Sequence, residues 1–285
     1  MSTPIHIHHN GNIIKETSFL ISPNNRSFRY GDGCFETMKV LNGQILLSDF
    51  HFDRLFASLQ ILQFDLPKFF TREYLLLQLL NLVKKNQHSK LARVRLMIYR
   101  GNGGLYDSES NFPNCLIQTW ELNPANNILN QNGLITDIFE GAKKVGDKFS
   151  AIKSNNYLGY AMAAMWVKEQ KINDAILLNA FDRVADATIA NVFIAKDNII
   201  KTSLLSEGGI NGIMRRVLIE RLPSIGMRVE ESCLSVDDLI GADEIFLTNS
   251  IYGIRWVKQL KEQKYKNELT QLIHKKIILP INRFD

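Results

Sequence analysis

The chain has 285 residues, 45% of them hydrophobic, so it can bury one large core or two smaller ones. No apolar run reaches the ~20 residues that span a bilayer, and the N-terminal Met1–His9 stretch lacks the basic and apolar regions of a signal peptide. The three cysteines, Cys34, Cys115 and Cys233, are odd in number and widely spaced, which fits neither a disulfide framework nor a metal motif. We therefore expect a cytoplasmic protein with no membrane association and no bound metal.

The charge balance is basic, with 34 Lys and Arg against 29 Asp and Glu, a net charge of +5. Such a balance permits a nucleic-acid partner when the basic residues cluster. Here they are spread along the whole chain, and an enzyme that acts on anionic small molecules explains the charge at least as well. We expect a small-molecule substrate and no nucleic acid.

The first 120 residues alternate short strands with two helices. An alternating run that holds His6, His8 and His9 ends at the hairpin signal Asn10-Gly11. A His-x-His pair could bind a metal, but no acidic or cysteine partner is near in the sequence, so a surface strand is the better interpretation.

Further along, residues 35–40 are predicted to form a strand that turns at Asn42-Gly43. A helix should follow from about residue 49 to 62, with Ser48 as its N-cap, and a second helix should begin at Thr71 and run to about residue 85. Residues 91–99 and 115–120 complete the predicted strands of this part. Short strands with two helices in this order indicate a small α+β domain over residues 1–120.

Residues 121–132 are polar and rich in turn formers, so we predict an interdomain linker there. Residues 133–285 are then a larger second domain. Its predicted strands cover 134–140, 174–179, 188–193, 227–231 and 243–249, and its predicted helices cover 156–170, 213–222, 236–239 and 267–277.

A glycine-rich loop, residues 208–212, leads into the predicted helix that starts at Ile213. The first N–H groups of a helix have no partner within it, so this arrangement can bind a phosphate or another anion. A glycine-rich surface turn is an equally good interpretation of the loop taken alone.

The full string is more specific, because Asp186, Thr188, Asn191 and Phe193 are followed by Thr202 and then by Gly212-Ile213-Met214-Arg215. This order resembles the class IV aminotransferase family, the pyridoxal-phosphate (PLP) enzymes of fold type IV. Earlier segments are similar to other family motifs. They are Gly31-Asp32-Gly33-Cys34-Phe35-Glu36, His51-Phe52-Asp53-Arg54-Leu55, Lys153-Ser154-Asn155-Asn156-Tyr157-Leu158 and Glu244-Ile245-Phe246-Leu247-Thr248-Asn249-Ser250.

The resemblance implies a two-domain α+β fold like that of D-amino acid aminotransferase, with a larger PLP-binding C-terminal domain. It also implies roles for single residues. Lys153 is the lysine that bonds to the cofactor. Tyr157 lies by the ring's phenolic oxygen, and Asp186 faces the pyridine nitrogen. The phosphate is held by Arg54, by the backbone amides of Ile213 and Met214, and by the Ser250 hydroxyl.

Two positions depart from the family pattern. Asp186 stands where the family usually has Glu, which shortens the acid by one methylene. Met214 stands where Thr is frequent, so the backbone amide is kept but a hydroxyl is lost.

The substrate end is predicted from position and chemistry. Candidates for recognising substrate carboxylates and polar groups are Tyr30, Arg95, Arg100, Tyr106 and Asn249. The Arg100-Gly-Asn-Gly-Gly loop resembles that of the 4-amino-4-deoxychorismate lyase branch, which releases pyruvate and forms 4-aminobenzoate for folate synthesis. The alternative is an aminotransferase for branched-chain or D-amino acids. A cofactor-free binding protein on the same fold is a third interpretation. The resemblance also implies a homodimer with its active site between the domains.

Overall fold

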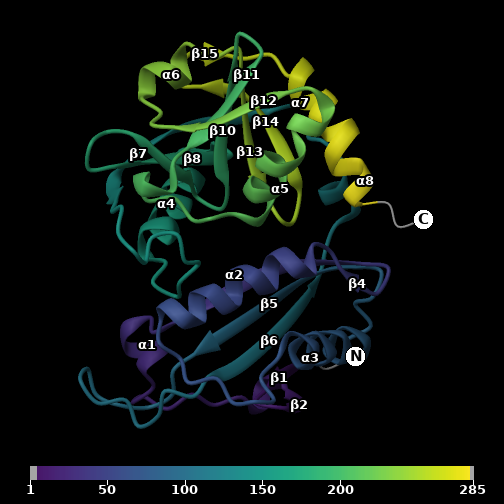
Figure 1. The fold of residues 1–285 in the computed structure, drawn as a ribbon, viewed down its shortest axis with the longest axis vertical. Coiled ribbons are helices and arrows are strands. Elements are labelled where there is room, and N and C mark those ends of the chain that lie inside the picture. The colour runs from purple at the N-terminus through teal and green to yellow at the C-terminus, as the bar shows by residue number, and fades with distance from the viewer. Residues whose placement is uncertain (1–4, 283–285) are drawn as a thin grey trace. The chain divides into compact units, whose positions relative to one another are not determined.

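The computed structural model describes residues 5–282 and divides into two compact units. Unit 1 comprises the residues up to Pro124 together with the short segment Ile152–Asn156. Unit 2 comprises Ala125–Ala151 and the chain from Tyr157 onward. The segment that carries Lys153 therefore belongs to unit 1, although it lies far along the sequence from the rest of that unit (Figure 1).

Unit 1 is built on a six-stranded sheet in the order β2-β1-β6-β5-β3-β4, and each pairing in it is antiparallel. The strands are β1 (His6–His9), β2 (Asn12–Lys15), β3 (Gly33–Leu41), β4 (Gln44–Ile45), β5 (Leu91–Tyr99) and β6 (Asn114–Glu121). The hairpin at Asn10-Gly11 and the turn at Asn42-Gly43 are confirmed, since the flanking strands pair directly.

The helices of unit 1 are α1 (Arg26–Tyr30), α2 (Ser48–Ile61) and α3 (Arg72–Lys85), with a 3₁₀ turn at Glu16–Ser18. Figure 1 shows α2 and α3 beside the sheet, and buried apolar residues of both helices pack with those of β3 and β5. Thr71 caps α3 as predicted, accepting a hydrogen bond from the Tyr74 N–H. The prediction for Ser48 was wrong. The chain leaves β4 through Leu47 in a left-handed conformation (φ 55°), so Ser48 is already the first helical residue.

Unit 2 is built on a nine-stranded mixed sheet in the order β12-β11-β10-β13-β14-β7-β8-β9, with β15 paired to β14. Parallel pairs are β11 with β12, β14 with β7, and β7 with β8. The strands are β7 (Leu134–Lys144), β8 (Asp174–Asn179), β9 (Val184–Ala187), β10 (Asn191–Lys196), β11 (Ile199–Ser203), β12 (Arg228–Ser232), β13 (Glu244–Asn249), β14 (Gly253–Leu260) and β15 (Gln263–Lys264).

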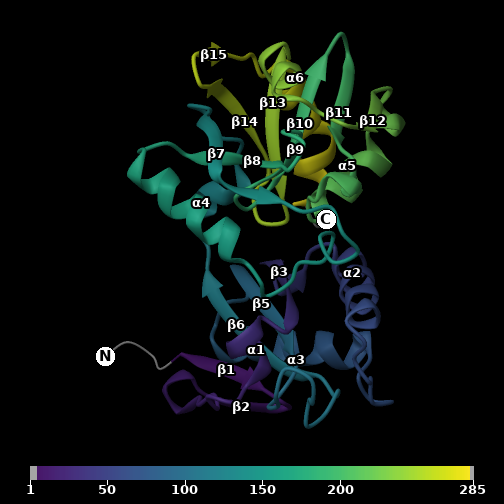
Figure 2. The same ribbon diagram turned by 90° about the vertical axis from the view of Figure 1, so that its left-hand side faces the viewer.

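The helices of unit 2 are α4 (Leu158–Glu169), α5 (Ile213–Arg221), α6 (Val236–Ile240), α7 (Glu268–Ile273) and α8 (Leu279–Ile281). Figure 1 labels α4 to α8, and Figure 2 shows α4, α5 and α6 from a second side. Short 3₁₀ turns cover Pro124–Asn127, Leu205–Glu207 and Pro223–Ile225. The predicted C-terminal helix is interrupted, because a π-helical turn at His274–Ile278 separates α7 from α8. Among the described residues, none of the helices has both the length and the apolar character needed to cross a bilayer.

One difference from the predicted strands matters for function. The first half of the expected strand 188–193, residues 188–190, forms a tight turn instead, closed by a 2.8 Å hydrogen bond from the Ala187 N–H to the Ala190 carbonyl. Asp186 therefore lies on β9, while Asn191 begins β10. The turn brings these two side chains together, as the hydrogen bond between them shows.

Candidate active site

Lys153 is fixed against the start of β3 by backbone hydrogen bonds. The Phe35 N–H donates to the Lys153 carbonyl, and the Asn155 N–H donates to the Gly33 carbonyl, each at 2.9 Å. Gly33 allows this approach, because a Cβ at that position would lie 2.6 Å from the Asn155 side-chain nitrogen. The backbone around Lys153 is thus hydrogen-bonded to β3, although it lies outside the named strands.

Two cationic side chains of unit 1 lie over the ring of Phe35. Lys153 Nζ lies 4.7 Å from the ring centroid, and the guanidinium carbon of Arg95 lies 4.4 Å from it. The register of β3 against β5 places Phe35 diagonally from Arg95 on the same sheet face. An amine and a guanidinium around one ring suit a substrate that carries a carboxylate near its reacting nitrogen.

Arg54 is buried on α2 and binds Glu36 of β3 through two hydrogen bonds. Its Nε donates to Glu36 Oε1 at 2.8 Å and its Nη2 donates to Oε2 at 2.6 Å. His51, one helical turn earlier, approaches Glu36 Oε2 through Nδ1 at 2.6 Å. Glu36 thus binds both Arg54 and His51, and its two contacts with Arg54 hold the guanidinium in one orientation.

The charges of this cluster follow from its burial. Burial acts to raise the pKa of the Glu36 carboxyl, but the Arg54 guanidinium and the His51 ring outweigh it and hold that pKa at about 2. Burial also lowers the pKa of His51 against the opposing effect of Glu36, so its ring is neutral at pH 7. Glu36 and Arg54 are thus an ion pair, and neutral His51 donates to Glu36 through Nδ1.

Asp186 is almost completely buried in unit 2, with 2% of its surface exposed. Its Oδ1 accepts a hydrogen bond from Asn191 Nδ2 at 3.0 Å. Its Oδ2 accepts two more, from the Tyr160 hydroxyl and from the Ile210 N–H, each at 3.0 Å. A buried carboxylate with these donors is oriented to meet a further positive group.

The loop before α5 packs closely on β9 and β10. A Cβ at Gly212 would lie 1.8 Å from Asn191 Oδ1, so no other residue fits there without a shift of the loop. Gly212 is also the N-cap of α5, and among residues 5–282 no side chain caps this end. The backbone amides at Ile213 and Met214 thus belong to an uncapped helix start, which is suited to an anion.

The remaining cofactor candidates of unit 2 lie at the ends of elements. Tyr157 is the N-cap residue of α4, and its ring stacks on Tyr160 at a centroid distance of 4.3 Å. Ser250 lies in the turn between β13 and β14. The Asn249 side chain shapes that turn by accepting from the Ile251 and Tyr252 N–H groups at 2.9 and 3.1 Å. Its amide also donates to the Ile189 carbonyl, so Asn249 has a clear structural task.

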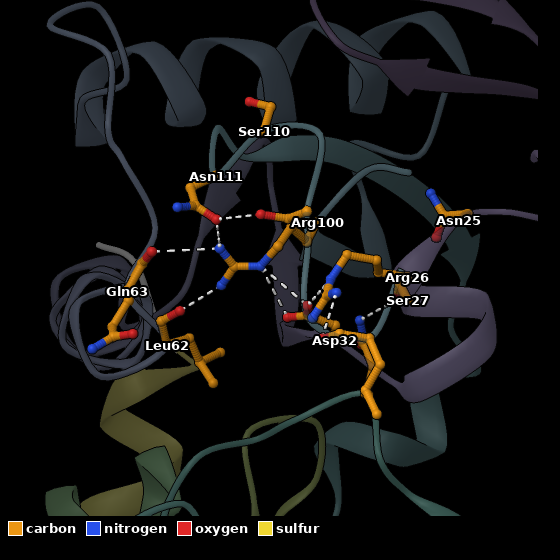
Figure 3. Close-up of polar contacts among 12 residues, drawn as sticks. Asn25, Arg26, Ser27, Asp32, Leu62, Gln63, Arg100, Ser110 and Asn111 are labelled. Atoms are coloured by element: carbon orange, nitrogen blue, oxygen red, sulfur yellow. Dashed lines mark hydrogen bonds and ion pairs between the residues drawn. The ribbon is translucent and has the colours of Figure 1, made fainter. Parts of the chain in front are cut away.

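Arg100 lies at the centre of a network inside unit 1, which Figure 3 shows. Its guanidinium donates to the backbone carbonyls of Leu62 and Gln63 just beyond α2, at 2.5 and 3.4 Å. It also donates to Asn111 Oδ1 at 2.6 Å and to the Asp32 carboxylate at 3.1 Å. Arg100 thus ties the glycine loop to the end of α2, and these contacts occupy most of its donors.

The two tyrosines proposed for the substrate differ in exposure. Tyr30 ends α1, is 36% exposed, and has the guanidinium of Arg29 4.9 Å from its ring centroid. Tyr106, in the glycine loop, is 93% exposed. Both rings are therefore accessible to a ligand.

Three residues of the site were missed as functional candidates in the sequence. Glu36 and His51 lie inside the motifs named above. The three-residue spacing of His51 and Arg54 places both on one helix face, and this could have indicated that His51 joins the site. Tyr160 follows Tyr157 by one helical turn, but nothing in the sequence pairs it with Asp186, 26 residues away.

The chain is similar to known proteins along most of its length. The family model for amino-transferase class IV matches residues 33–260. The chain is 30% identical to aminodeoxychorismate lyase of Vibrio harveyi over 243 residues, covering 85% of this chain and 88% of that protein. It is 29% identical to aminodeoxychorismate lyase of Bacillus subtilis over 282 residues, covering 95% and 94%. The structure superposes on branched-chain aminotransferase of Thermoproteus uzoniensis with a TM-score of 0.87 and 22% identity, covering 98% and 95%.

The chain belongs to the class IV aminotransferase family. The predicted fold is confirmed by the structural superposition, and the chain is an enzyme of this family.

Proposed function

We propose that the protein is a PLP-dependent 4-amino-4-deoxychorismate lyase, which eliminates pyruvate and leaves 4-aminobenzoate for folate synthesis. The observation that carries this proposal is the placement of Lys153 and Arg95 around the ring of Phe35. In the proposed reaction, the Lys153 amine transfers protons and the nearby Arg95 guanidinium binds a substrate carboxylate. The similarity to two lyases of this name supports the choice of reaction.

The residues present fit the cofactor. Asp186 is a buried carboxylate with an oriented pair of oxygens, as a protonated pyridine nitrogen requires. For the phosphate, the uncapped start of α5 offers the amides of Ile213 and Met214, and we add the Arg54 guanidinium and the Ser250 hydroxyl. Tyr157 would lie by the phenolic oxygen. Met214 supplies only its amide, since its side chain is buried and apolar.

Bound PLP supplies the electron sink that makes a proton next to the substrate nitrogen removable. Lys153 would hold the cofactor, and once the substrate is bound its amine would take the proton from the substrate carbon next to the nitrogen. The same amine would return a proton to the departing enolpyruvyl group, so that it leaves as pyruvate and the substrate ring remains as 4-aminobenzoate.

Arg95 is the first choice for the substrate carboxylate, because it shares the Phe35 ring with Lys153. Arg100 is the weaker choice, since its donors hold backbone carbonyls and Asp32. Tyr30 and Tyr106 are exposed and available for the second polar group of a chorismate-type substrate. Asn249 would contact the substrate only through atoms not engaged in its turn.

The alternative is an aminotransferase for branched-chain or D-amino acids. The superposition on a branched-chain aminotransferase shows the fold alone and does not separate the two reactions. The two reactions share the cofactor residues and differ only at the substrate.

The deciding experiment supplies 4-amino-4-deoxychorismate to the PLP-loaded protein and measures pyruvate with a coupled dehydrogenase. A parallel assay supplies branched-chain or D-amino acids with 2-oxoglutarate and measures glutamate. Pyruvate release without a keto-acid acceptor would support the lyase. Glutamate formation that depends on 2-oxoglutarate would instead show that the protein is an aminotransferase.

Lys153→Ala should abolish either activity and the visible cofactor band. The matched control is Lys148→Ala, an exposed lysine of the same region, which should retain both. A protein that takes up no PLP would instead support the cofactor-free binding protein. We also propose a cytoplasmic homodimer, and light scattering that gives the mass of one chain would reject the dimer.

A further inference from the structure

Asp186 is one methylene shorter than the Glu that the family usually has at this position, and the structure shows how its carboxylate is oriented. Three donors meet the two oxygens of Asp186: the Asn191 amide, the Tyr160 hydroxyl and the Ile210 N–H. All three are neutral. These neutral donors stabilise the ionised form of the carboxylate, and Lys144 adds a positive charge that acts on it through space.

The hydroxyl of Tyr160 is itself held rigidly. The residue lies in the first turn of α4, is 5% exposed, and stacks on Tyr157 with an interplanar angle of 25°. A buried ring that stacks on a half-buried one has little rotational freedom, so the position of the Tyr160 hydroxyl is set by the helix. This turn therefore carries both Tyr157, which is proposed to lie by the phenolic oxygen of PLP, and Tyr160, which donates to Asp186.

A cation lies on the face of the Tyr160 ring. Lys144 Nζ, at the end of β7, is 4.3 Å from the ring centroid. A positive charge there is attracted to the π system and draws electron density from it, which makes the phenol a stronger hydrogen-bond donor. Burial and the nearby Asp186 charge raise the pKa of Tyr160 well above its ordinary value, so the hydroxyl keeps its proton and remains a donor.

We propose that Tyr160 is a positioning residue, which points the Asp186 carboxylate at the cofactor's ring nitrogen and so replaces the reach of the missing methylene, with Lys144 strengthening its hydrogen bond. The inference rests on the proposed use of PLP and goes beyond it, because it assigns a role to two residues outside the family motifs. Tyr160 acts through Asp186 and touches neither substrate nor reacting atoms.

The test uses Tyr160→Phe, which removes only the hydroxyl. Titration of the apoprotein with PLP should show affinity about tenfold weaker than in the unchanged protein, the size expected for one hydrogen bond to a charged group. The visible band of the bound cofactor should also shift, since the ring nitrogen loses its oriented partner. The matched control is Tyr265→Phe, because the Tyr265 hydroxyl is also buried in unit 2 and donates to the Leu239 carbonyl at 3.0 Å.

A double-mutant cycle separates positioning from general packing. If Tyr160 works through Asp186, then Tyr160→Phe should have almost no further effect on PLP affinity in an Asp186→Asn background. Full additivity of the two changes would overturn the inference, as would a Tyr160→Phe protein whose affinity and spectrum match those of Tyr265→Phe. In both cases the proposed function would stand. Failure of the unchanged protein to bind PLP would overturn both proposals.

Discussion

Each unit buries one charged side chain that is proposed to meet the cofactor, and the two are stabilised in opposite ways. Arg54 in unit 1 is balanced by a full opposite charge, because Glu36 binds its guanidinium through both oxygens. Asp186 in unit 2 accepts hydrogen bonds from three neutral donors, and the charge of Lys144 acts on it through space. A buried ion pair cancels most of its own field, whereas a carboxylate held by dipoles keeps its charge available.

The difference suggests a division of labour. The Glu36–Arg54 pair stabilises the fold of unit 1, and in the proposed site its guanidinium, held in one orientation, would meet the phosphate. Asp186 should contribute less to the stability of the fold, because a neutral acceptor in its place could still accept hydrogen bonds from its three donors. Its proposed role is to bind the positively charged ring nitrogen of the cofactor. Changes on the two sides should therefore separate stability from cofactor affinity.

The largest effect is expected for Glu36→Gln, which leaves the Arg54 guanidinium buried without its counter-charge. The free energy of unfolding should fall by about 3–5 kcal/mol, as measured by urea denaturation of the apoprotein. The double variant Glu36→Gln/Arg54→Met should recover part of the loss, since it removes the uncompensated charge. A single variant as stable as the unchanged protein would refute the structural role of the pair.

Acid should weaken the same pair in the unchanged protein. The pKa of Glu36 is lowered from an ordinary 4.5 to about 2 in the folded state, so its stabilisation is present above pH 4.5 and is lost as pH falls toward 2. The loss should amount to about 3 kcal/mol over that interval. Denaturation curves at stepped pH measure it, and Glu36→Gln should lack this component of the acid dependence.

Asp186→Asn should act mainly on the cofactor. We expect PLP affinity to fall about thirtyfold, equal to about 2 kcal/mol, while the stability of the apoprotein falls less than in Glu36→Gln. Titration with PLP and urea denaturation of the same sample give both values. Equal losses of stability in the two variants would show that Asp186 is a structural charge like Glu36, and unchanged turnover would reject its catalytic role.

The smallest effect is expected for Lys144→Met, which removes the cation on the Tyr160 ring but keeps the length of the side chain. PLP affinity should fall about two- to threefold, as for a partly buried cation–π contact. Burial lowers the pKa of Lys144 while the Asp186 charge opposes that change, so this lysine is a modest contributor. Lys143→Met, an exposed neighbour on β7, serves as the control and should bind PLP normally.

The sequence predicted the parts of the fold that rest on local signals. Thr71 and the helix after it, the Asn10-Gly11 hairpin and the strand Leu91–Tyr99 were all recoverable from capping, turn residues and periodicity. The π-helical turn at His274–Ile278 was not, since nothing in the residue pattern distinguishes it from a continuous helix.

The site was predictable only through the resemblance, which selected Lys153 from several lysines with equal claims. The contacts that orient the site join residues far apart in the sequence. Arg100 binds carbonyls of Leu62 and Gln63, 38 and 37 positions away, and a backbone carbonyl leaves no trace in residue identity. The roles of the predicted cofactor and substrate residues remain predictions.

The placement of Ile152–Asn156 in unit 1 has a consequence for biosynthesis. The chain passes from one unit to the other at Pro124–Ala125, at Ala151–Ile152 and at Asn156–Tyr157. When the ribosome has made only the first 124 residues, the backbone groups at Gly33 and Phe35 that bond to this segment have no partner within the nascent chain. Unit 1 is therefore completed late, after the first strand of unit 2 has emerged. A fragment that ends at residue 124 should be degraded by protease far faster than the same region in the full-length protein.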